Sequence, residues 1–329
     1  MKHGLLLLNI GSPDAPTISS VRRYLRVFLS DPRVIDLPVL LRLLLVYCFI
    51  LPFRPRRSAE AYHAVWTPEG SPLMRYSERM CQSLQTALGP QYTVVLGMRY
   101  GKPSIQSALD ALSACDRITV WPLYPQYSSA ATGSSIEAVL KGIASKPIFP
   151  SMNVIRDFYK HPAYIKAQAA EIAPYIHTHD YILFSYHGLP ENHLLKEGCN
   201  PVCTKACRPE GGARGCYRAQ CLETTASLTH ALKITEYSTS FQSRLGRTPW
   251  IKPYTDIVLV ELAARGIKRL AVVCPSFVTD CLETLEEIGM RAKEQWLSLG
   301  GETFTLIPCM NDSEQWIDAM KAIAISNER

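Results

Sequence analysis

The fold is indicated first by the stretch Leu5-Leu6-Leu7-Leu8-Asn9-Ile10-Gly11-Ser12-Pro13, a short apolar run that ends in a Gly-Ser-Pro turn. A continuous apolar run of this length is typical of a strand that is buried on both faces. The amphipathic stretch at residues 19–28 has the periodicity of a helix. The beginning of the chain therefore predicts a buried strand, a turn and a helix.

The same alternation recurs along the rest of the chain. Further apolar runs predict strands at residues 93–98, 118–124, 181–186, 270–274 and 304–307. Further amphipathic stretches predict helices at residues 78–88, 105–113, 136–143, 164–173 and 255–265. Strands that alternate with helices in both halves predict an α/β fold with parallel sheets, each flanked by helices. In such sheets, ligands bind at the loops that follow the carboxyl ends of the strands.

Length and composition agree with this architecture. A chain of 329 residues is long for one hydrophobic core and predicts two domains. Hydrophobic residues make up 47% of the chain and charged residues 19%, which excludes the disordered class. The net charge of +6 suits an anionic small molecule or a membrane surface better than a nucleic-acid groove.

The cysteines indicate a metal site. The apolar run after Met1 is short and lacks a small-residue cleavage site, so we expect no export and a reducing compartment. Five of the eleven cysteines lie between Cys199 and Cys221, and thiols clustered in such a compartment are typical of metal ligands. The scattered cysteines are expected to be small buried hydrophobic residues. They are Cys48, Cys81, Cys115, Cys274, Cys281 and Cys309.

The most apolar segment of the chain is residues 37–53, which carries Arg42 and precedes Arg54, Arg56 and Arg57. It is too short and too interrupted to span a bilayer, which requires about 20 apolar residues. Two interpretations are open. The segment is either a buried core helix or an apolar lip that enters the membrane interface, with the arginines meeting lipid phosphates or an anionic ligand.

Four titratable residues follow two of the predicted strands. His187 comes directly after one strand, and Asp280, Glu283 and Glu287 come after another. If a helix begins near Asp280, the three carboxylates share one face. They then form either a helix cap with solvated glutamates behind it, or a buried relay whose crowding raises their pKa values enough to pass protons near neutral pH. A histidine after a strand is ambiguous in the same way.

Six motifs resemble the ferrochelatase family, and they occur in the family's order between residue 5 and about residue 320. They are Leu7-Leu8-Asn9-Ile10-Gly11-Ser12-Pro13, Leu123-Tyr124-Pro125-Gln126-Tyr127-Ser128, Thr132-Gly133-Ser134-Ser135, Phe184-Ser185-Tyr186-His187-Gly188-Leu189-Pro190, Phe241-Gln242-Ser243 and Asp280-Cys281-Leu282-Glu283-Thr284-Leu285-Glu286-Glu287. The resemblance implies a lyase that inserts Fe²⁺ into a porphyrin and releases two pyrrole protons, on two Rossmann-like domains with the active site in the cleft between them.

The resemblance also implies a role for each titratable residue. His187 matches the histidine that accepts a pyrrole proton or binds the incoming iron, and Glu283 matches its carboxylate partner. Asp280 and Glu287 match a polar chain that moves protons or metal. An imidazole and a carboxylate are reasonable transient ligands for Fe²⁺.

Further positions match residues that line the family's porphyrin pocket. They are Ile10, Arg54, Tyr62, Ser71, Arg99, Tyr100, Tyr124 and Trp250. Aromatic rings stack on a macrocycle, and hydroxyl or guanidinium groups hold propionates. Each tyrosine is equally consistent with a half-buried sheet residue, and Arg56 and Arg57 compete with Arg54 for its role. Ile10 is apolar, as in relatives that use protoporphyrin IX, whereas relatives that use coproporphyrin resemble one another in having tyrosine there.

The expected domain boundaries follow from this match. Residues 1–130 form the first domain with the apolar lip at residues 37–53, and residues 131–311 form the second with a cysteine-rich insertion at residues 199–216. A C-terminal helix at residues 312–328 is expected to pack back on the first domain. The expected location is the cytoplasm, peripherally at the inner face of the membrane, with the preceding porphyrinogen oxidase as a partner.

The cysteine-rich insertion departs from the plain family pattern. Four thiolates suit an iron–sulfur cluster, and the resemblance to members with a [2Fe-2S] cluster favours Cys199, Cys203, Cys207 and Cys216 as ligands. Cys221 is left out because it lies where the ordinary family sequence resumes. Zinc and free thiols are the alternatives. For the whole chain, the alternatives are a porphyrin or haem carrier, a coproporphyrin ferrochelatase, or a related chelatase for cobalt or nickel.

Overall fold

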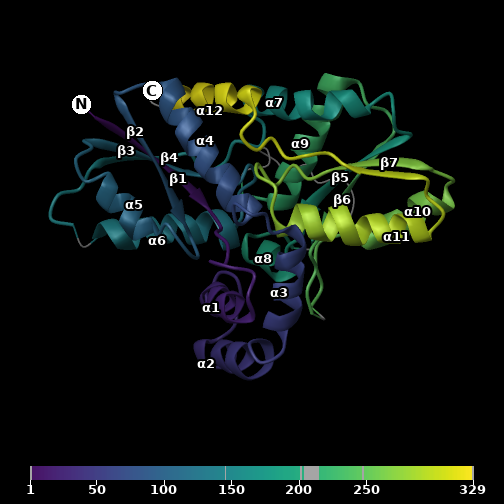
Figure 1. Cartoon of the computed structure of the whole chain (residues 1–329), viewed down its shortest axis with the longest axis horizontal. Coiled ribbons are helices and arrows are strands. Elements are labelled where there is room, and N and C mark those ends of the chain that lie inside the picture. The colour runs from purple at the N-terminus through teal and green to yellow at the C-terminus, as the bar shows by residue number, and fades with distance from the viewer. Residues whose placement is uncertain (1, 145, 201, 204–214, 247, 328–329) are drawn as a thin grey trace. The chain divides into compact units, whose positions relative to one another are not determined.

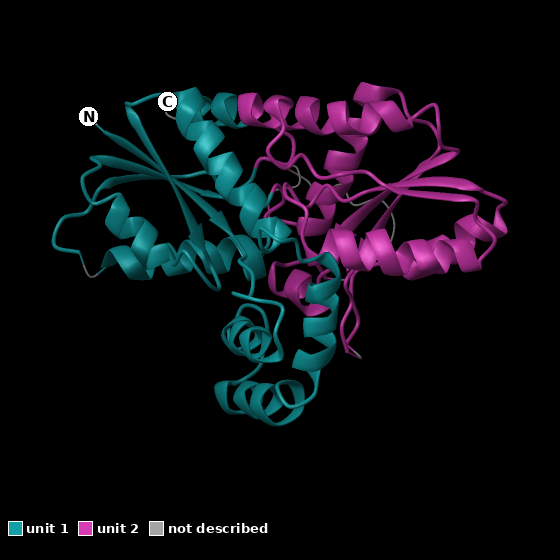
Figure 2. Ribbon diagram, in the orientation of Figure 1, with its two compact units in different colours: residues 1–124, 128–157, 320–329 teal, residues 125–127, 158–319 magenta. Residues whose placement is uncertain are grey.

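The computed structural model describes residues 2–144, 146–200, 202–203, 215–246 and 248–327, and it divides into two compact units (Figures 1 and 2). The first unit contains residues 1–124, 128–157 and 320–329, and the second contains residues 125–127 and 158–319. Each unit is built around a four-stranded parallel sheet. The predicted α/β class is confirmed.

The sheet of the first unit has the strand order β2-β1-β3-β4. The elements of this unit are β1 (His3–Asn9), α1 (Ile18–Leu29), α2 (Val39–Leu44), η1 (Leu45–Ile50), α3 (Arg54–Val65), α4 (Pro72–Leu88), β2 (Tyr92–Met98), α5 (Ile105–Ala111), β3 (Arg117–Pro122), η2 (Ser129–Gly133), α6 (Ser134–Ala144) and β4 (Ser151–Val154). Alternate strand residues point to opposite faces of a sheet. Leu6 and Leu8 accordingly pack in one core cluster with α5 and α6.

The sheet of the second unit has the order β6-β5-β7-β8. Its elements are α7 (Pro162–Ile172), η3 (Ala173–Tyr175), β5 (Tyr181–His187), α8 (Glu191–Lys196), α9 (Tyr217–Leu232), β6 (Tyr237–Gln242), α10 (Thr255–Ala264), β7 (Arg269–Val273), η4 (Glu283–Ala292), α11 (Lys293–Ser298) and β8 (Thr303–Leu306). Phe184 and Tyr186 pack in one cluster with α7, α8 and α9, whereas Tyr181 and Leu183 pack in another with α10, η4 and α11. The last helix, α12 (Glu314–Ser326), follows.

The boundary predicted at residue 130 differs from the observed division. Residues 128–157 belong to the first unit, because the short strand β4 pairs with β3 at the edge of the first sheet. Of the residues in the predicted C-terminal helix, those from 320 onward group with the first unit, where the backbone oxygen of Asn327 accepts a hydrogen bond of 2.6 Å from Asn153.

Residues 37–53 do not form a core helix, so that interpretation is wrong. They form α2 and the π-helix η1, and large apolar side chains there are exposed: Leu40 by 81%, Phe49 by 63% and Phe53 by 77%. Val46 instead faces inward and packs on α1. Among the described residues, no helix is long and apolar enough to cross a membrane.

Candidate active site

His187 is the last residue of β5 and is fixed by three hydrogen bonds. Its backbone N–H donates to the hydroxyl of Ser276 (2.9 Å), and its backbone oxygen accepts from the hydroxyl of Tyr217 (2.8 Å). Its ring Nδ1 lies 2.6 Å from the backbone oxygen of Gly188. A carbonyl oxygen only accepts, so Nδ1 is the protonated nitrogen of the neutral ring. The other nitrogen, Nε2, therefore carries the free lone pair.

Gly188 is required by a close approach between two strand ends. A Cβ at this position would lie 2.7 Å from the backbone oxygen of Gln242 and 3.2 Å from the Trp250 ring. The Gly188 N–H donates to that same Gln242 oxygen at 2.8 Å. The Trp250 and Phe277 rings lie 6.5 and 6.2 Å from the imidazole of His187, measured between centroids. The histidine thus has a partly apolar surrounding.

Glu287 is held by Ser243, the residue that follows β6. The Ser243 backbone N–H donates to one carboxylate oxygen at 2.7 Å, and its hydroxyl donates to the other at 2.6 Å. Ser243 adopts φ of +68°, a left-handed conformation that disfavours residues other than glycine. Burial raises the pKa of Glu287, and the two Ser243 hydrogen bonds and the nearby His187 act in the opposite direction. The strained backbone therefore aims both donors at one carboxylate.

Glu283 is the first residue of the π-helix η4, and Glu287 lies about one turn further on. The side-chain amide of Gln242 donates to the backbone oxygen of Glu283 at 2.8 Å. Gln242 also accepts from Ser185 of β5 at 2.8 Å. The end of β6 therefore connects the strand of His187 to the helix of the two glutamates.

Asp280 lies among groups that satisfy its carboxylate. It is 5% exposed, and it accepts hydrogen bonds from the Thr284 hydroxyl (2.9 Å), the Asn311 amide (2.8 Å) and the backbone N–H of Cys309 (3.4 Å). Its own N–H donates to Asn311 at 2.8 Å. These contacts anchor Asp280 at the start of η4, and its predicted part in a polar chain that moves protons or metal stays a prediction.

In the first unit, the predicted residues Ile10, Arg99 and Tyr100 meet at the carboxyl ends of β1 and β2. The N–H groups of Arg99 and Tyr100 donate to Asn9 and Ile10 at 2.8 and 2.9 Å. Ile10 is half-buried, whereas Tyr100 is 1% exposed and packs its ring on Phe28. Tyr100 therefore contributes to packing rather than to a ligand surface.

The other predicted residues of this unit lie on or next to β3, α3 and α4. Tyr124 follows β3, is half-buried, and lies with its hydroxyl 3.5 Å from that of Ser135. Arg54 begins α3, and Tyr62 further along α3 packs edge-on against Tyr24. Ser71 precedes α4 and is 6% exposed, which leaves it little surface for a ligand.

Comparison with known proteins assigns the chain to a family. The family model described as Ferrochelatase matches residues 2–328. The chain belongs to the ferrochelatase family. It is 55% identical to a ferrochelatase of Legionella pneumophila, with 98% of each chain covered, and 50% identical to a ferrochelatase of Coxiella burnetii, with 98% of this chain and 93% of the relative covered. These matches support a ferrochelatase function, which makes the enzyme a lyase.

Solved structures of chelatases share the fold of this ferrochelatase-family chain. SirB from Bacillus subtilis with Fe³⁺ superposes with a TM-score of 0.56 at 11% identity and covers 99% of this chain and 96% of its own. The sirohydrochlorin chelatase SirB in complex with cobalt, from Bacillus subtilis subspecies spizizenii, gives 0.55 at 11% identity, with 100% and 96% covered. Identity this low shows the fold alone.

The cysteines of this family member fall into two groups. Cys115, Cys274, Cys281 and Cys309 are buried as predicted, Cys81 is half-buried, and Cys48 is exposed. Of the predicted cluster ligands, Cys199, Cys203 and Cys216 are half-buried, and Cys207 lies outside the described residues. Cys221 is completely buried, and burial raises its pKa well above the ordinary value. Among the described residues, no three His, Cys, Asp or Glu side chains are grouped to hold a metal ion.

Two residues that hold predicted site residues, one in each unit, were missed from the sequence. Ser243 belongs to a family-like motif, yet nothing in a serine signals a left-handed backbone. Asp31, which binds Arg99 and Tyr100, follows a helix and precedes Pro32, a context typical of an ordinary turn.

Proposed function

We propose that the chain inserts Fe²⁺ into protoporphyrin IX, with His187 and the two glutamates of η4 as its reacting groups. One observation supports this more than any other. Nδ1 of His187 donates to a backbone oxygen, so Nε2 offers a lone pair at the carboxyl edge of the sheet. A lone pair there either accepts a pyrrole proton or binds the incoming Fe²⁺.

The reaction balance requires acceptors for two protons. One Fe²⁺ enters the macrocycle and two N–H bonds of the pyrroles break, so each nitrogen keeps its electron pair for iron while two protons leave. His187 can take one proton, and we assign the second to Glu287, a carboxylate whose pKa burial raises above its ordinary value. Glu283, the first residue of η4, is our candidate for a carboxylate ligand of the entering iron.

Substitution of His187 tests this function. We expect His187→Ala to lose turnover while porphyrin binding, followed by quenching of protein fluorescence, is kept. Unchanged turnover would overturn the assignment. A protein that binds porphyrin without any metallation in its unsubstituted form would be a carrier, and faster turnover with Co²⁺ or Ni²⁺ than with Fe²⁺ would make it a different chelatase.

The choice of protoporphyrin IX rests on apolar surface. Ile10 is half-buried at the end of β1, and the exposed apolar side chains of α2 and η1 lie on the same unit. Vinyl groups suit such surface, whereas the two extra propionates of coproporphyrin carry charge that is costly to desolvate. We expect a higher kcat/KM for protoporphyrin IX than for coproporphyrin, and Ile10→Tyr to reduce that preference.

A [2Fe-2S] cluster on Cys199, Cys203, Cys207 and Cys216 is the second part of the proposal. The guanidinium of Arg218, which is 3% exposed, donates to the sulfur of Cys203 at 3.5 Å and so places a buried positive charge beside this set of thiols. Cys221 is left out of the ligand set because it lies within α9 and packs in the hydrophobic core of the second unit. When bound, the cluster would supply one-electron chemistry or a link between the segments that carry these cysteines.

Metal analysis tests the cluster. We expect two irons and two sulfides per chain and a red-brown visible spectrum, both lost in Cys203→Ser. One zinc per chain in a colourless protein would assign the cysteines to zinc, and no metal would assign free thiols.

The exposed apolar side chains suit a membrane interface, and we place the chain in the cytoplasm at the inner face of the membrane. They are Leu37, Val39, Leu40, Leu41, Leu43, Leu44, Tyr47, Phe49 and Phe53. Arg56 and Arg57, exposed on the adjoining α3, can meet anionic headgroups. This position would let the preceding porphyrinogen oxidase hand over an apolar product.

Lipid binding tests this placement. We expect co-sedimentation with vesicles that contain anionic lipid, and loss of it in the double variant Leu43→Ser/Leu44→Ser. Equal sedimentation of both proteins, or none of either, would contradict the proposal.

A further inference from the structure

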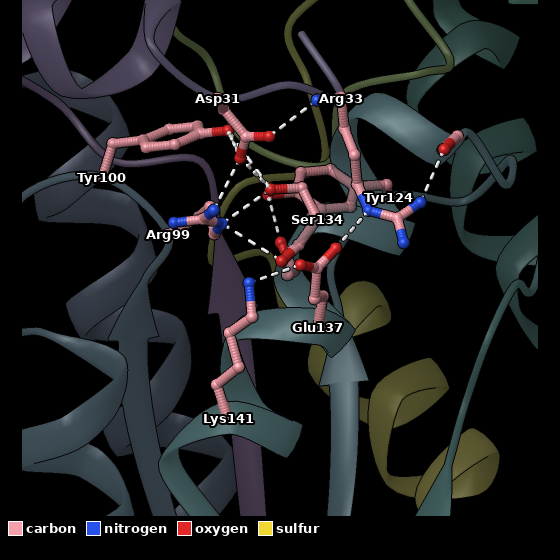
Figure 3. Close-up of polar contacts among 10 residues, drawn as sticks. Asp31, Arg33, Arg99, Tyr100, Tyr124, Ser134, Glu137 and Lys141 are labelled. Atoms are coloured by element: carbon pink, nitrogen blue, oxygen red, sulfur yellow. Dashed lines mark hydrogen bonds and ion pairs between the residues drawn. The ribbon is translucent and has the colours of Figure 1, made fainter. Parts of the chain in front are cut away.

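A buried carboxylate, Asp31, organises the carboxyl end of the first sheet (Figure 3). Its Oδ2 accepts hydrogen bonds from Nη2 of Arg99 (2.5 Å), the hydroxyl of Tyr100 (2.8 Å) and the hydroxyl of Ser134 (2.6 Å). Its Oδ1 accepts from the backbone N–H of Arg33 at 2.8 Å. Four donors from the segment after α1, the loop after β2 and the start of α6 therefore converge on one side chain.

Asp31 is the ionised partner of Arg99. Its side chain is 4% exposed, and burial alone would raise its pKa. The hydrogen bonds from Ser134, the Arg33 N–H and Tyr100, together with the charge of Arg99, outweigh burial and lower the pKa below the ordinary value. The carboxylate is charged at neutral pH and is fully supplied with donors.

The contacts fix the guanidinium of Arg99 from three sides. Besides the bond to Asp31, its Nε donates to the hydroxyl (2.6 Å) and the backbone oxygen (3.1 Å) of Ser134, and its central carbon lies 4.6 Å from the centre of the Tyr100 ring. Within the described part of the chain, Nη1 has no hydrogen-bond partner, and the side chain is 23% exposed. Arg99 also lines an open groove of about 630 Å³ in this unit.

A second ion pair lies beside this group but does not touch Arg99. Glu137 of α6 accepts from Nε of Arg33 (2.6 Å) and from Lys141 (2.5 Å), and Arg33 also donates to Ser129 (2.8 Å). The hydrogen bond from Lys141, and after it the one from Arg33, lower the pKa of Glu137 to about 2. Glu137 is 35% exposed. Glu137 and Lys141 line the same groove as Arg99, so this ion pair is part of its surroundings.

We propose that Asp31 is a positioning residue that acts through Arg99: it holds the guanidinium so that Nη1 is presented to substrate at the ends of β1 and β2. This inference rests on the proposed function, porphyrin metallation, and adds Arg99 to it as a residue that contacts substrate. The backbone of Arg99 is fixed as well, because its N–H donates to the backbone oxygen of Asn9. An arginine left without its buried carboxylate would turn toward other acceptors, and Nη1 would lose its fixed direction.

The test measures kcat, and KM for both substrates, in the full-length protein and four variants. Arg99→Gln is expected to raise KM about tenfold for one of the two substrates, Fe²⁺ or porphyrin. A change of about tenfold corresponds to the loss of one charge-assisted contact. Asp31→Asn is expected to raise KM for the same substrate by the same factor, and the double variant by no more than Arg99→Gln alone. Asp180→Asn, the control, weakens the ion pair between Asp180 and Arg269 in the second unit and is expected to leave both KM values within about twofold.

Each outcome decides the inference. Effects that multiply in the double variant, or a normal KM in either Asp31→Asn or Arg99→Gln, would overturn it. Should Asp31→Asn not fold, Ser134→Ala replaces it, because this change removes one hydrogen bond from Asp31 and one from Arg99 but leaves their ion pair. A rise of about threefold in KM for the same substrate would support the inference. An unchanged KM would overturn it. No turnover in the unsubstituted protein would overturn the proposed function, and this inference with it.

Discussion

The link between Ser243 and Glu287 yields a prediction that separates function from stability. Ser243→Ala removes a 2.6 Å hydrogen bond to a half-buried carboxylate but keeps the left-handed backbone. A hydrogen bond to a charged group contributes about 1.5 to 3 kcal/mol. Because Glu287 keeps the backbone donor and some access to water, we take the lower end, which corresponds to about a tenfold lower kcat.

Ser243→Gly loses the same hydroxyl but accepts the observed φ without strain. It should therefore match Ser243→Ala in kcat and exceed it in free energy of unfolding by about 1 to 2 kcal/mol. Lys233→Gly is the control for strain, because Lys233 also has a left-handed φ, of 54°, at the end of α9. It should gain a similar stability at unchanged kcat.

The assay is haem formation under anaerobic conditions, with urea unfolding measured on the same preparations. Full activity of Ser243→Ala would refute the idea that its hydroxyl holds Glu287 for the reaction. A Ser243→Gly variant no more stable than Ser243→Ala would refute the assignment of backbone strain.

Three further predictions follow from neighbouring contacts. Gly188→Ala should lose about 1 to 3 kcal/mol in urea unfolding, because its Cβ would meet the Gln242 oxygen at 2.7 Å; equal stability would contradict this close approach. Tyr217→Phe removes the 2.8 Å bond to the backbone oxygen of His187 and should lower kcat about threefold with both KM values unchanged, whereas a change in KM alone would show that it acts on binding. Asp31→Asn should lower the free energy of unfolding by about 3 kcal/mol at pH 7. The native pKa of Asp31 lies below its ordinary value of 3.8. The difference in free energy of unfolding between the unsubstituted protein and Asp31→Asn should therefore be constant above pH 3.8 and shrink as the pH falls through the native pKa. A difference that grows on acidification would refute an ionised Asp31.

The interior strands of both sheets were predictable from sequence, and two edge strands were not. β1 and β5 are buried on both faces and read as continuous apolar runs. β4 (Ser-Met-Asn-Val) and β6 (Tyr-Ser-Thr-Ser-Phe-Gln) lie at sheet edges, where polar residues are tolerated. Missing β4 also displaced the predicted domain boundary.

Sequence predicted which residues belong to the candidate site better than it predicted what each of them does. His187 and the glutamates stand after apolar strands, a pattern that sequence reveals. The role of Asp280 depends on Asn311 and Thr284, and that of Asp31 on Arg99 and Ser134, partners whose proximity only the fold creates. The π-helical turns of η1 and η4 were likewise invisible, because their sequences have ordinary helical periodicity.

The most direct test of the central claim is an anaerobic assay of the purified chain with Fe²⁺ and protoporphyrin IX, run beside His187→Ala. We expect protohaem from the unsubstituted chain, none above background from the variant, and equal porphyrin binding by both. Protohaem formed at the same rate by His187→Ala would contradict the claim that Nε2 of this histidine takes part in the reaction.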